Sequence, residues 1–436
     1  MPASMPVSRI DKVIQNTYKH NQASNYTEVI RALDRQFDYE KQRHLYWGIP
    51  EQSLLYGTPF YEQCSADQKL ALNHLYWSFA YTATAAAELQ TVMFNQVTAD
   101  VFAALGGYET LYDELTLETE QEKVHIHAFQ NINRKTVQAL LGDRTFERLL
   151  RREDGGQTTS HPMAQTVFDG LSGITDLALR KYRSYQSRYL QTLKQKHRII
   201  PAPITGFGYM KSGLLSQSLL RFFILNWGSS PFLASQYYNV RYMANGLLKN
   251  REHSISRYFR QRKKEGQKIA YPTAVSHYHF LDESFHTTMS QFLGREFYRE
   301  LPPPTAYETL LSNISIYTVQ ANSLTGLNAA IPGIYLDDDQ YILRFLYELL
   351  QLDLFGLSAS DALHELEQAF CHEHEGLHVA SLWHSRLRND YRHFFSHLPF
   401  LWKKNRDLSF MDKGASIDKV LQRNQTSFQS FVAQAA

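Results

Sequence analysis

The sequence has little cysteine, almost no net charge and no long apolar run. Its 436 residues include only two cysteines, Cys64 and Cys371, which cannot form a disulfide framework, so a reducing compartment is favoured. The 45 basic and 43 acidic side chains leave a net charge of +2, which gives no reason to expect nucleic acid as a partner. No stretch reaches 18 uninterrupted apolar residues, so we expect no membrane span.

The start of the chain, MPASMPVSRIDKVIQ, has none of the apolar core that is typical of a signal peptide. Together with the scarcity of cysteine, this predicts a cytoplasmic protein. Hydrophobic residues make up 43% of the chain, enough to bury a sizeable core. The 27 tyrosines and 26 phenylalanines belong mostly to that core, although some could line an aromatic substrate pocket.

Most of the sequence shows patterns typical of helices. Ser65 followed by Gln68 forms a capping-box signature, and no proline or glycine occurs from there to about Ala104. Few runs alternate with a period of two, so the sequence predicts an all-α fold. Further helices are predicted at Leu111 to Leu141, Met163 to His197, Leu214 to Trp227, Phe232 to Lys264, Pro272 to Glu300, 305–325, 339–353, 360–395 and 415–433.

The chain divides at a proline run, Pro302 to Pro304. Residues 1–64 are polar and aromatic and read as a peripheral segment, and residues 65–301 as a helical bundle with a segment inserted around 143–210. Residues 305–436 read as a C-terminal helical extension that packs on the bundle.

Two glutamate and histidine pairs are spaced for one helix face. Glu122 and His125, and likewise Glu283 and His286, are three residues apart, so each pair projects from one side of its helix. A carboxylate and an imidazole side by side suit a metal such as iron. A single pair of this kind is weak, because it often marks only a solvated helix face.

Single acids in apolar surroundings strengthen the metal hypothesis. Glu88 is the only acid between Asp67 and Asp100, in the most apolar predicted helix, where an unpaired carboxylate would be costly. Glu252 precedes the second pair in a stretch poor in acids, although it could instead pair with Arg251 or Lys249 on a surface helix. His279 lies four residues before Glu283 and shares its face.

The candidate ligands follow a recognisable order. They occur as Glu88, Glu122-Lys-Val-His125, Glu252 and His279-Phe-Leu-Asp-Glu283-Ser-Phe-His286. This order resembles the para-aminobenzoate N-oxygenase family, whose di-iron site has four glutamates and three histidines. The gaps of 34 residues from Glu88 to Glu122 and 27 from Glu252 to His279 are close to that family's pattern, whereas the 127 residues from His125 to Glu252 imply an insertion. The resemblance covers residues 65 to 300.

This resemblance implies a ferritin-like four-helix bundle core with additional N- and C-terminal helices. It implies a non-haem di-iron oxygenase with two iron ions, cycling between Fe2+ and Fe3+, and O2 as co-substrate. The substrate would be a small organic molecule, with N-oxygenation of an amine in the named family. C–H hydroxylation and desaturation would use the same ligands. Two electrons would come from an external donor such as a ferredoxin or reductase, and a homodimer is compatible with the sequence.

Two nearby features have alternative interpretations. Asp282, next to Glu283, could accept a hydrogen bond from a ligand histidine or could be an exposed helix acid. The basic run at residues 257–268 could attract an acidic electron-transfer partner or an anionic substrate, with a solvated helix end as the simpler explanation.

A competing metal motif lies near the C-terminus, where six histidines fall between residues 372 and 397. His374-Glu375-Gly376-Leu377-His378 matches a zincin signature, with His384 at the place of a third ligand, so a zinc-dependent peptidase is an alternative function. Ser381 stands where the related peptidases use glycine, and a continuous helix would turn His384 about 120° away from His378. An auxiliary metal site or a polar helix face are the other interpretations.

Overall fold

The computed structural model describes residues 9–154, 162–195, 217–323, 327, 330–334, 339–414 and 416–435. In this part of the chain every regular element is a helix, so the predicted all-α class is confirmed. None of the described helices combines the length and apolar character needed to cross a membrane. Cys64 and Cys371 are both free thiols, as their scarcity and spacing suggested.

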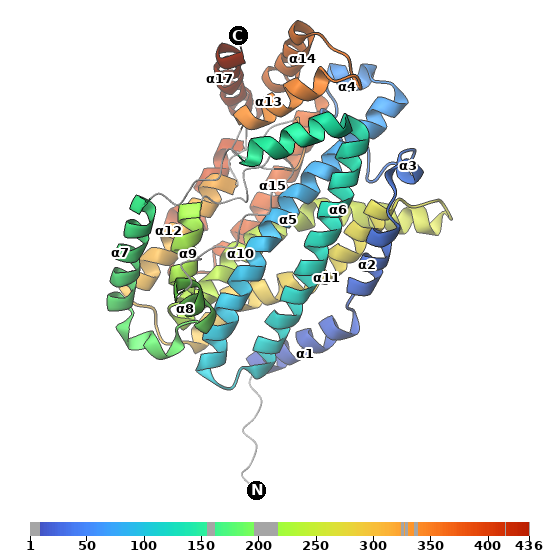
Figure 1. The fold of residues 1–436 in the computed structure, drawn as a ribbon. Coiled ribbons are helices and arrows are strands. Elements are labelled where there is room, and N and C mark those ends of the chain that lie inside the picture. Colours follow the sequence, from blue (N-terminus) through green and yellow to red (C-terminus); the bar gives the residue numbers. More distant parts are fainter. Residues whose placement is uncertain are drawn as a thin grey trace.

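Four long helices form the centre of the molecule (Figure 1). They are α5 (Ala66–Leu105), α6 (Glu109–Asp154), α10 (Pro231–Lys264) and α11 (Tyr271–Arg295). Helix α5 packs along α6, α10 packs along α11, and the two pairs meet where α5 contacts α10 and α6 contacts α11. Each pair is a hairpin with a short connection, which brings helices from distant parts of the sequence around one core.

Local sequence explains where these helices begin. Ser65 and Gln68 form the predicted capping box at the start of α5. Ser230 caps α10, and Pro231 takes the first helical position, where its missing N–H costs nothing. Helix α5 is buried around most of its circumference, which accounts for its run of apolar and small residues.

The N-terminal helices pack on this centre. Helices α1 (Arg9–Ala23) and α2 (Thr27–Gln36) both contact α6 and α11, and the short helices α3 (Tyr39–Gln42) and α4 (Pro59–Gln63) follow. Asn21 of α1 and the backbone of Tyr26 make hydrogen bonds to buried side chains of α6 and α11. The first residues of the described chain therefore contribute to the interior of the bundle.

The remaining elements surround the centre. Helices α12 and α15 contact α10, whereas α13, α14 and α17 pack on one another at one end of the molecule (Figure 1). These elements are α7 (Pro162–Ala178), η1 (Arg180–Tyr185), α8 (Arg188–Gln195), α9 (Gln217–Trp227), η2 (Phe297–Glu300), α12 (Ala306–Ser323), α13 (Asp339–Leu350), α14 (Ala359–Cys371), α15 (Glu375–Phe395), α16 (Lys403–Arg406), η3 (Ser409–Gly414) and α17 (Ile417–Ala435).

Some predicted helix boundaries are wrong. The helix expected over 360–395 is two helices, because His372 and His374 have extended backbones between α14 and α15. The helix expected from Met163 to His197 is broken into α7, η1 and α8, and its last residues, with the rest of the segment to 210, lie outside the described residues. At Gly142, φ is 78°, so the predicted end of the helix is a kink after which helical structure resumes.

The contact between α10 and α11 depends on a glycine. A Cβ at Gly294 would lie 2.3 Å from Asn239 Oδ1 and 3.1 Å from the Asn239 backbone nitrogen. We expect Gly294→Ala to lower the free energy of unfolding by about 1–3 kcal/mol, because the helices must separate. Gly173→Ala is the control, since nothing lies within 4 Å of the added Cβ and alanine favours the helix. Thermal unfolding of both variants measures the difference, and equal melting temperatures would contradict this packing.

Candidate metal centre

The seven predicted ligands come together where the four long helices meet. Helix α5 supplies Glu88, α6 supplies Glu122 and His125, α10 supplies Glu252, and α11 supplies His279, Glu283 and His286. All seven are buried, with exposed fractions of 5% or less. The three-residue spacing on α6 and the four- and three-residue spacings on α11 place each set on the inner face of its helix.

Six of the seven form two overlapping groups of possible ligand atoms. One group contains Glu88, His125, His279 and Glu283, the other contains Glu122, Glu283 and His286, and the ligand atoms of each lie within 4.8 Å of one another. Glu283 belongs to both groups. Two groups that share one carboxylate have the composition of a site for two neighbouring ions.

The seventh residue, Glu252, lies on the other side of His279. The Nε2 atom of His279 is 2.7 Å from Glu88 Oε1 and 3.6 Å from Glu283 Oε1, whereas Nδ1 is 2.7 Å from Glu252 Oε1. An imidazole ligand binds an ion through one nitrogen and donates its other N–H to an orienting acceptor. Glu252 occupies the position of that acceptor. Glu252 is buried and faces His279. The alternative interpretation, in which it pairs with Arg251 or Lys249 on a surface helix, is therefore wrong.

The other two histidines are oriented in the same way. His125 places Nε2 3.2 Å from Asp282 Oδ2, and Asp282 also accepts from the backbone N–H of Tyr26 at 3.3 Å. His286 places Nε2 3.0 Å from Gln121 Oε1, which leaves Nδ1 facing Glu283. Asp282 is therefore buried and not an exposed helix acid.

Four buried ligand atoms have no hydrogen-bond partner among the described residues. They are Glu88 Oε2, Glu122 Oε2, Glu252 Oε2 and His125 Nδ1. Leaving such atoms buried and unpaired is costly, and for carboxylates it is several-fold more costly than for neutral groups. A bound cation would remove this cost. The donor set of oxygen and imidazole nitrogen without thiolate fits iron.

The cluster shifts the pKa values of its members. Burial raises the pKa of Glu88 to about 7, against the opposing effect of His279. Burial disfavours the charge on His125, yet its hydrogen bond to Asp282 and the nearby carboxylate of Glu122 raise its pKa to about 9. For Glu122 and Glu283 the neighbouring imidazole of His286 outweighs burial and lowers the pKa. These shifts favour protonated imidazoles beside ionised carboxylates when no metal is bound.

A second buried charge network adjoins the cluster. Arg241 of α10 is 1% exposed and donates to Glu122 at 3.1 Å and to Glu118. Glu114 lies one further turn along α6 and accepts from Asn21 at 3.0 Å. Burial, followed by the charge of Glu118, raises the pKa of Glu114 to about 8. The four-residue spacing of these glutamates on α6 was the available sequence signal, and sequence reasoning missed it.

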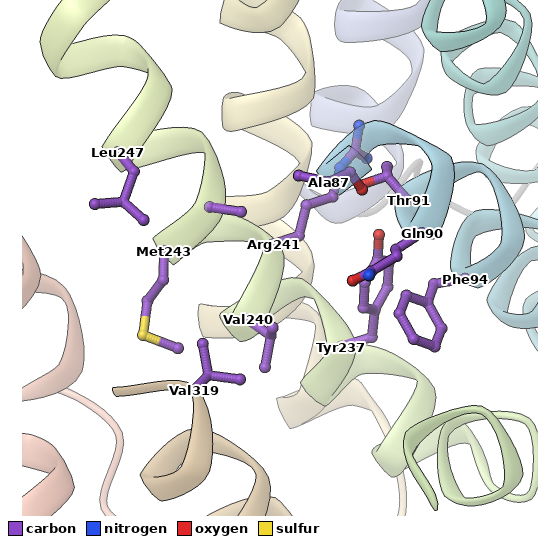
Figure 2. A pocket seen from close by; sticks show the side chains of 11 residues that line it. Ala87, Gln90, Thr91, Phe94, Tyr237, Val240, Arg241, Met243, Leu247 and Val319 are labelled. Carbon is purple, nitrogen blue, oxygen red and sulfur yellow. The ribbon is translucent and has the colours of Figure 1, made fainter. Parts of the chain in front are cut away.

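Figure 2 shows an apolar pocket, one of whose lining residues, Arg241, donates to Glu122 of the cluster. Its walls come from α5, α10 and α12, and its polar groups gather on the α5 side, where Arg241 reaches Ala87 and Thr91. Met243, Leu247 and Val319 lie toward the opposite side in this view. The lining residues are Ala87, Gln90, Thr91, Phe94, Tyr237, Val240, Arg241, Met243, Ala244, Leu247 and Val319. Of these, Ala87 immediately precedes Glu88 in the sequence, and Arg241 donates to Glu122, so the pocket adjoins the candidate ligands.

The structure does not bring the C-terminal histidines together. His374 precedes helix α15 and its Nε2 is 2.9 Å from the Ala369 carbonyl oxygen, while exposed His378 pairs with Glu373 at 2.8 Å. His384 is buried against Gly414. Among the described residues, no group of three metal ligands includes His374, Glu375, His378 or His384.

The glycine of the zincin motif has a packing role in this structure. A Cβ on Gly376 would lie 2.0 Å from the Tyr56 carbonyl oxygen, so this glycine lets the start of α15 approach the N-terminal segment. Because α15 begins at Glu375, the two histidines of the zincin pattern do not occupy successive turns of one helix. This helix boundary gives no support to the alternative cluster of His374, Glu375, His378 and His384.

Comparison with known proteins gives one match. The family model described as "Acyl halogenase CylC-like" matches residues 9–432. Searches of curated proteins and of solved structures found no significant match. The match overturns the expected membership of the para-aminobenzoate N-oxygenase family, because it spans nearly the whole chain, whereas the resemblance covered only residues 65 to 300.

We expect the metal-free protein to lose stability as pH rises from about 5 to 9. The pKa values of Glu88, Glu114 and His125 are raised in the folded state, so the folded protein holds protons that the unfolded chain releases at lower pH. The melting temperature should fall by about 5 °C or more over this range, and Fe(II) should restore it at high pH because binding displaces the protons. A metal-free melting temperature that rises with pH would contradict the protonated cluster.

Asp282→Asn tests the orientation of His125. We expect metal affinity to fall by about 10- to 100-fold, because the amide holds the ring less firmly than the carboxylate. Asp100→Asn is the matched control: Asp100 also accepts from a backbone N–H, of Tyr189, but lies 12 residues beyond Glu88 on α5. Competition with a metal chelator measures both affinities. Equal affinities for the two variants would show that Asp282 does not support the centre.

Proposed function

We propose, since the chain belongs to the CylC-like acyl halogenase family, that it is an O2-dependent enzyme that replaces a C–H bond of an acyl chain by a carbon–halogen bond. The observation that carries the proposal is the buried cluster of carboxylates and imidazoles, four atoms of which have no partner in the described chain. Such a cluster, inside a member of an oxidative enzyme family, supports a pair of iron ions as cofactor.

Each residue of the cluster would have a defined task. Six side chains would bind the two ions as the groups Glu88, His125, His279 and Glu283, and Glu122, Glu283 and His286. Glu252, Asp282 and Gln121 would hold the far nitrogens of the three imidazoles. Three ligand carboxylates and nearby Glu252 would balance the four positive charges of two Fe(II) ions. When bound, the iron pair supplies the activation of O2.

The overall reaction needs electrons from outside the substrate. In balanced form, R–H + X⁻ + O2 + 2e⁻ + 3H⁺ gives R–X + 2H2O. The carbon loses a hydrogen and gains the halogen, a two-electron oxidation, while O2 accepts four electrons and becomes two molecules of water. The other two electrons would come from an external donor such as a ferredoxin or reductase.

The apolar pocket supports an acyl chain as the substrate. Its apolar side chains, such as Leu247, Met243 and Val319, would bury methylene groups and keep water out. Arg241, on the pocket wall, would hold Glu122 in place through its hydrogen bond of 3.1 Å. The pocket would thereby bring a methylene group of the chain next to the ligand cluster.

Turnover of the iron-loaded protein tests this proposal. Given a medium-chain acyl thioester, bromide, O2 and a chemical reductant with a mediator, the wild-type protein should give a monobrominated product by mass spectrometry. Glu122→Ala should reduce the rate at least about 100-fold, because a ligand is lost. Glu120→Ala should retain the wild-type rate, since Glu120 is exposed two residues earlier on the same helix and pairs only with Lys123.

Other products would contradict halogenation. A hydroxylated or desaturated acyl chain formed in the presence of bromide would assign the same cluster to C–H hydroxylation or desaturation. A protein that binds one zinc ion and consumes no O2 would contradict the iron pair altogether.

A further inference from the structure

Helix α10 carries two buried arginines with very different surroundings. Arg241 and Arg251 are 1% and 6% exposed. The guanidinium of Arg241 is neutralised, because it donates to the carboxylates of Glu118 and Glu122. Arg251 has no such carboxylate partner among the residues that the structure describes, although it lies immediately before Glu252 in the sequence.

Arg251 makes only one weak hydrogen bond through its side chain. Its Nη2 atom is 3.4 Å from Thr84 Oγ1, and its Nε atom has no partner in the described part of the chain. No carboxylate of the described residues lies within 4.0 Å of it, since Glu252 faces His279. The nearby Tyr76 and Tyr81 use their hydroxyl groups on backbone oxygens and Ser276.

A buried guanidinium in this state needs an anion. Arginine remains protonated at every physiological pH, so it cannot escape the cost of burial by losing its charge. A buried charge without a counter-ion costs several kcal/mol. Arg251 is 6% exposed and Thr84 is buried, so bulk solvent offsets only part of that cost.

Arg251 and its hydrogen-bond partner Thr84 both lie close to candidate metal ligands. Thr84 lies one helical turn before Glu88 on α5, and Arg251 is adjacent to Glu252 on α10. Arg251 and its hydrogen-bond partner therefore lie on the two helices, α10 and α5, that place Glu252 and Glu88 beside His279. An anion held here would lie next to the ligands without belonging to them.

We propose that Arg251 and the hydroxyl group of Thr84 bind a halide ion. This inference rests on the proposed function, in which a halide is the only small anionic substrate. The groups that face the position, guanidinium N–H and hydroxyl O–H, can all donate, and a halide accepts several hydrogen bonds without a preferred direction. The site would supply the halide from beside the centre, while the apolar pocket supplies the acyl chain.

Bromide identifies the site directly. Crystals of the iron-loaded protein grown with bromide should show an anomalous bromine peak within hydrogen-bond distance of Arg251. The peak should disappear in Arg251→Gln, and KM for bromide should rise at least 10-fold while iron content stays at the wild-type level. Arg257→Gln, an exposed arginine on the same helix, should change neither.

Arg251→Lys covers the case in which the glutamine variant does not fold. Lysine retains the charge but offers a single ammonium group, so KM for bromide should lie between those of the wild type and the glutamine variant. Brominated product with no peak at Arg251 and unchanged KM in both variants would overturn the halide site and leave the proposed function intact. A peak at Arg251 without any halogenated product would support the anion site and contradict the proposed function.

Discussion

The burial of many ionisable groups at one point is the constraint on which the rest of the structure depends. Seven carboxylate and imidazole side chains from four helices lie within a core that excludes water. Their cost is limited only because each carboxylate faces an imidazole, an arginine or a position fit for a cation. The helices must therefore meet in one register, since a shift of a single turn would separate charges from their partners. The outer helices pack around this core.

Sequence patterns predicted the features that reside within single helices. Glu88 was found because a lone acid in an apolar helix is costly, and Glu122, His125, Glu283 and His286 because their spacing places them on one face. His279 was named because it lies four residues before Glu283, and it completes the six members of the two ligand groups. Glu252 was expected among them but lies on the far nitrogen of His279, a distinction that depends on the distance between α10 and α11.

What the sequence could not provide are contacts between helices and the boundaries of short connections. Arg241 with Glu118, and Gln121 with His286, join residues more than one hundred positions apart. The alternative zincin motif lies at such a boundary: α15 begins at Glu375, and Gly376 packs against the backbone of Tyr56. The expected family was wrong for a related reason: ligand spacing describes a metal site, whereas the family match rests on nearly the whole chain. The division of the chain at Pro302 to Pro304 stays a prediction.

The N-terminal helices add a further consequence. Asn21 links Glu114 to Gln121, which holds His286, and the backbone of Tyr26 donates to Asp282, which holds His125. If the proposed iron pair occupies the centre, these hydrogen bonds link its binding to the order of residues 9–36: binding of the ions and ordering of the two N-terminal helices would each lower the free-energy cost of the other.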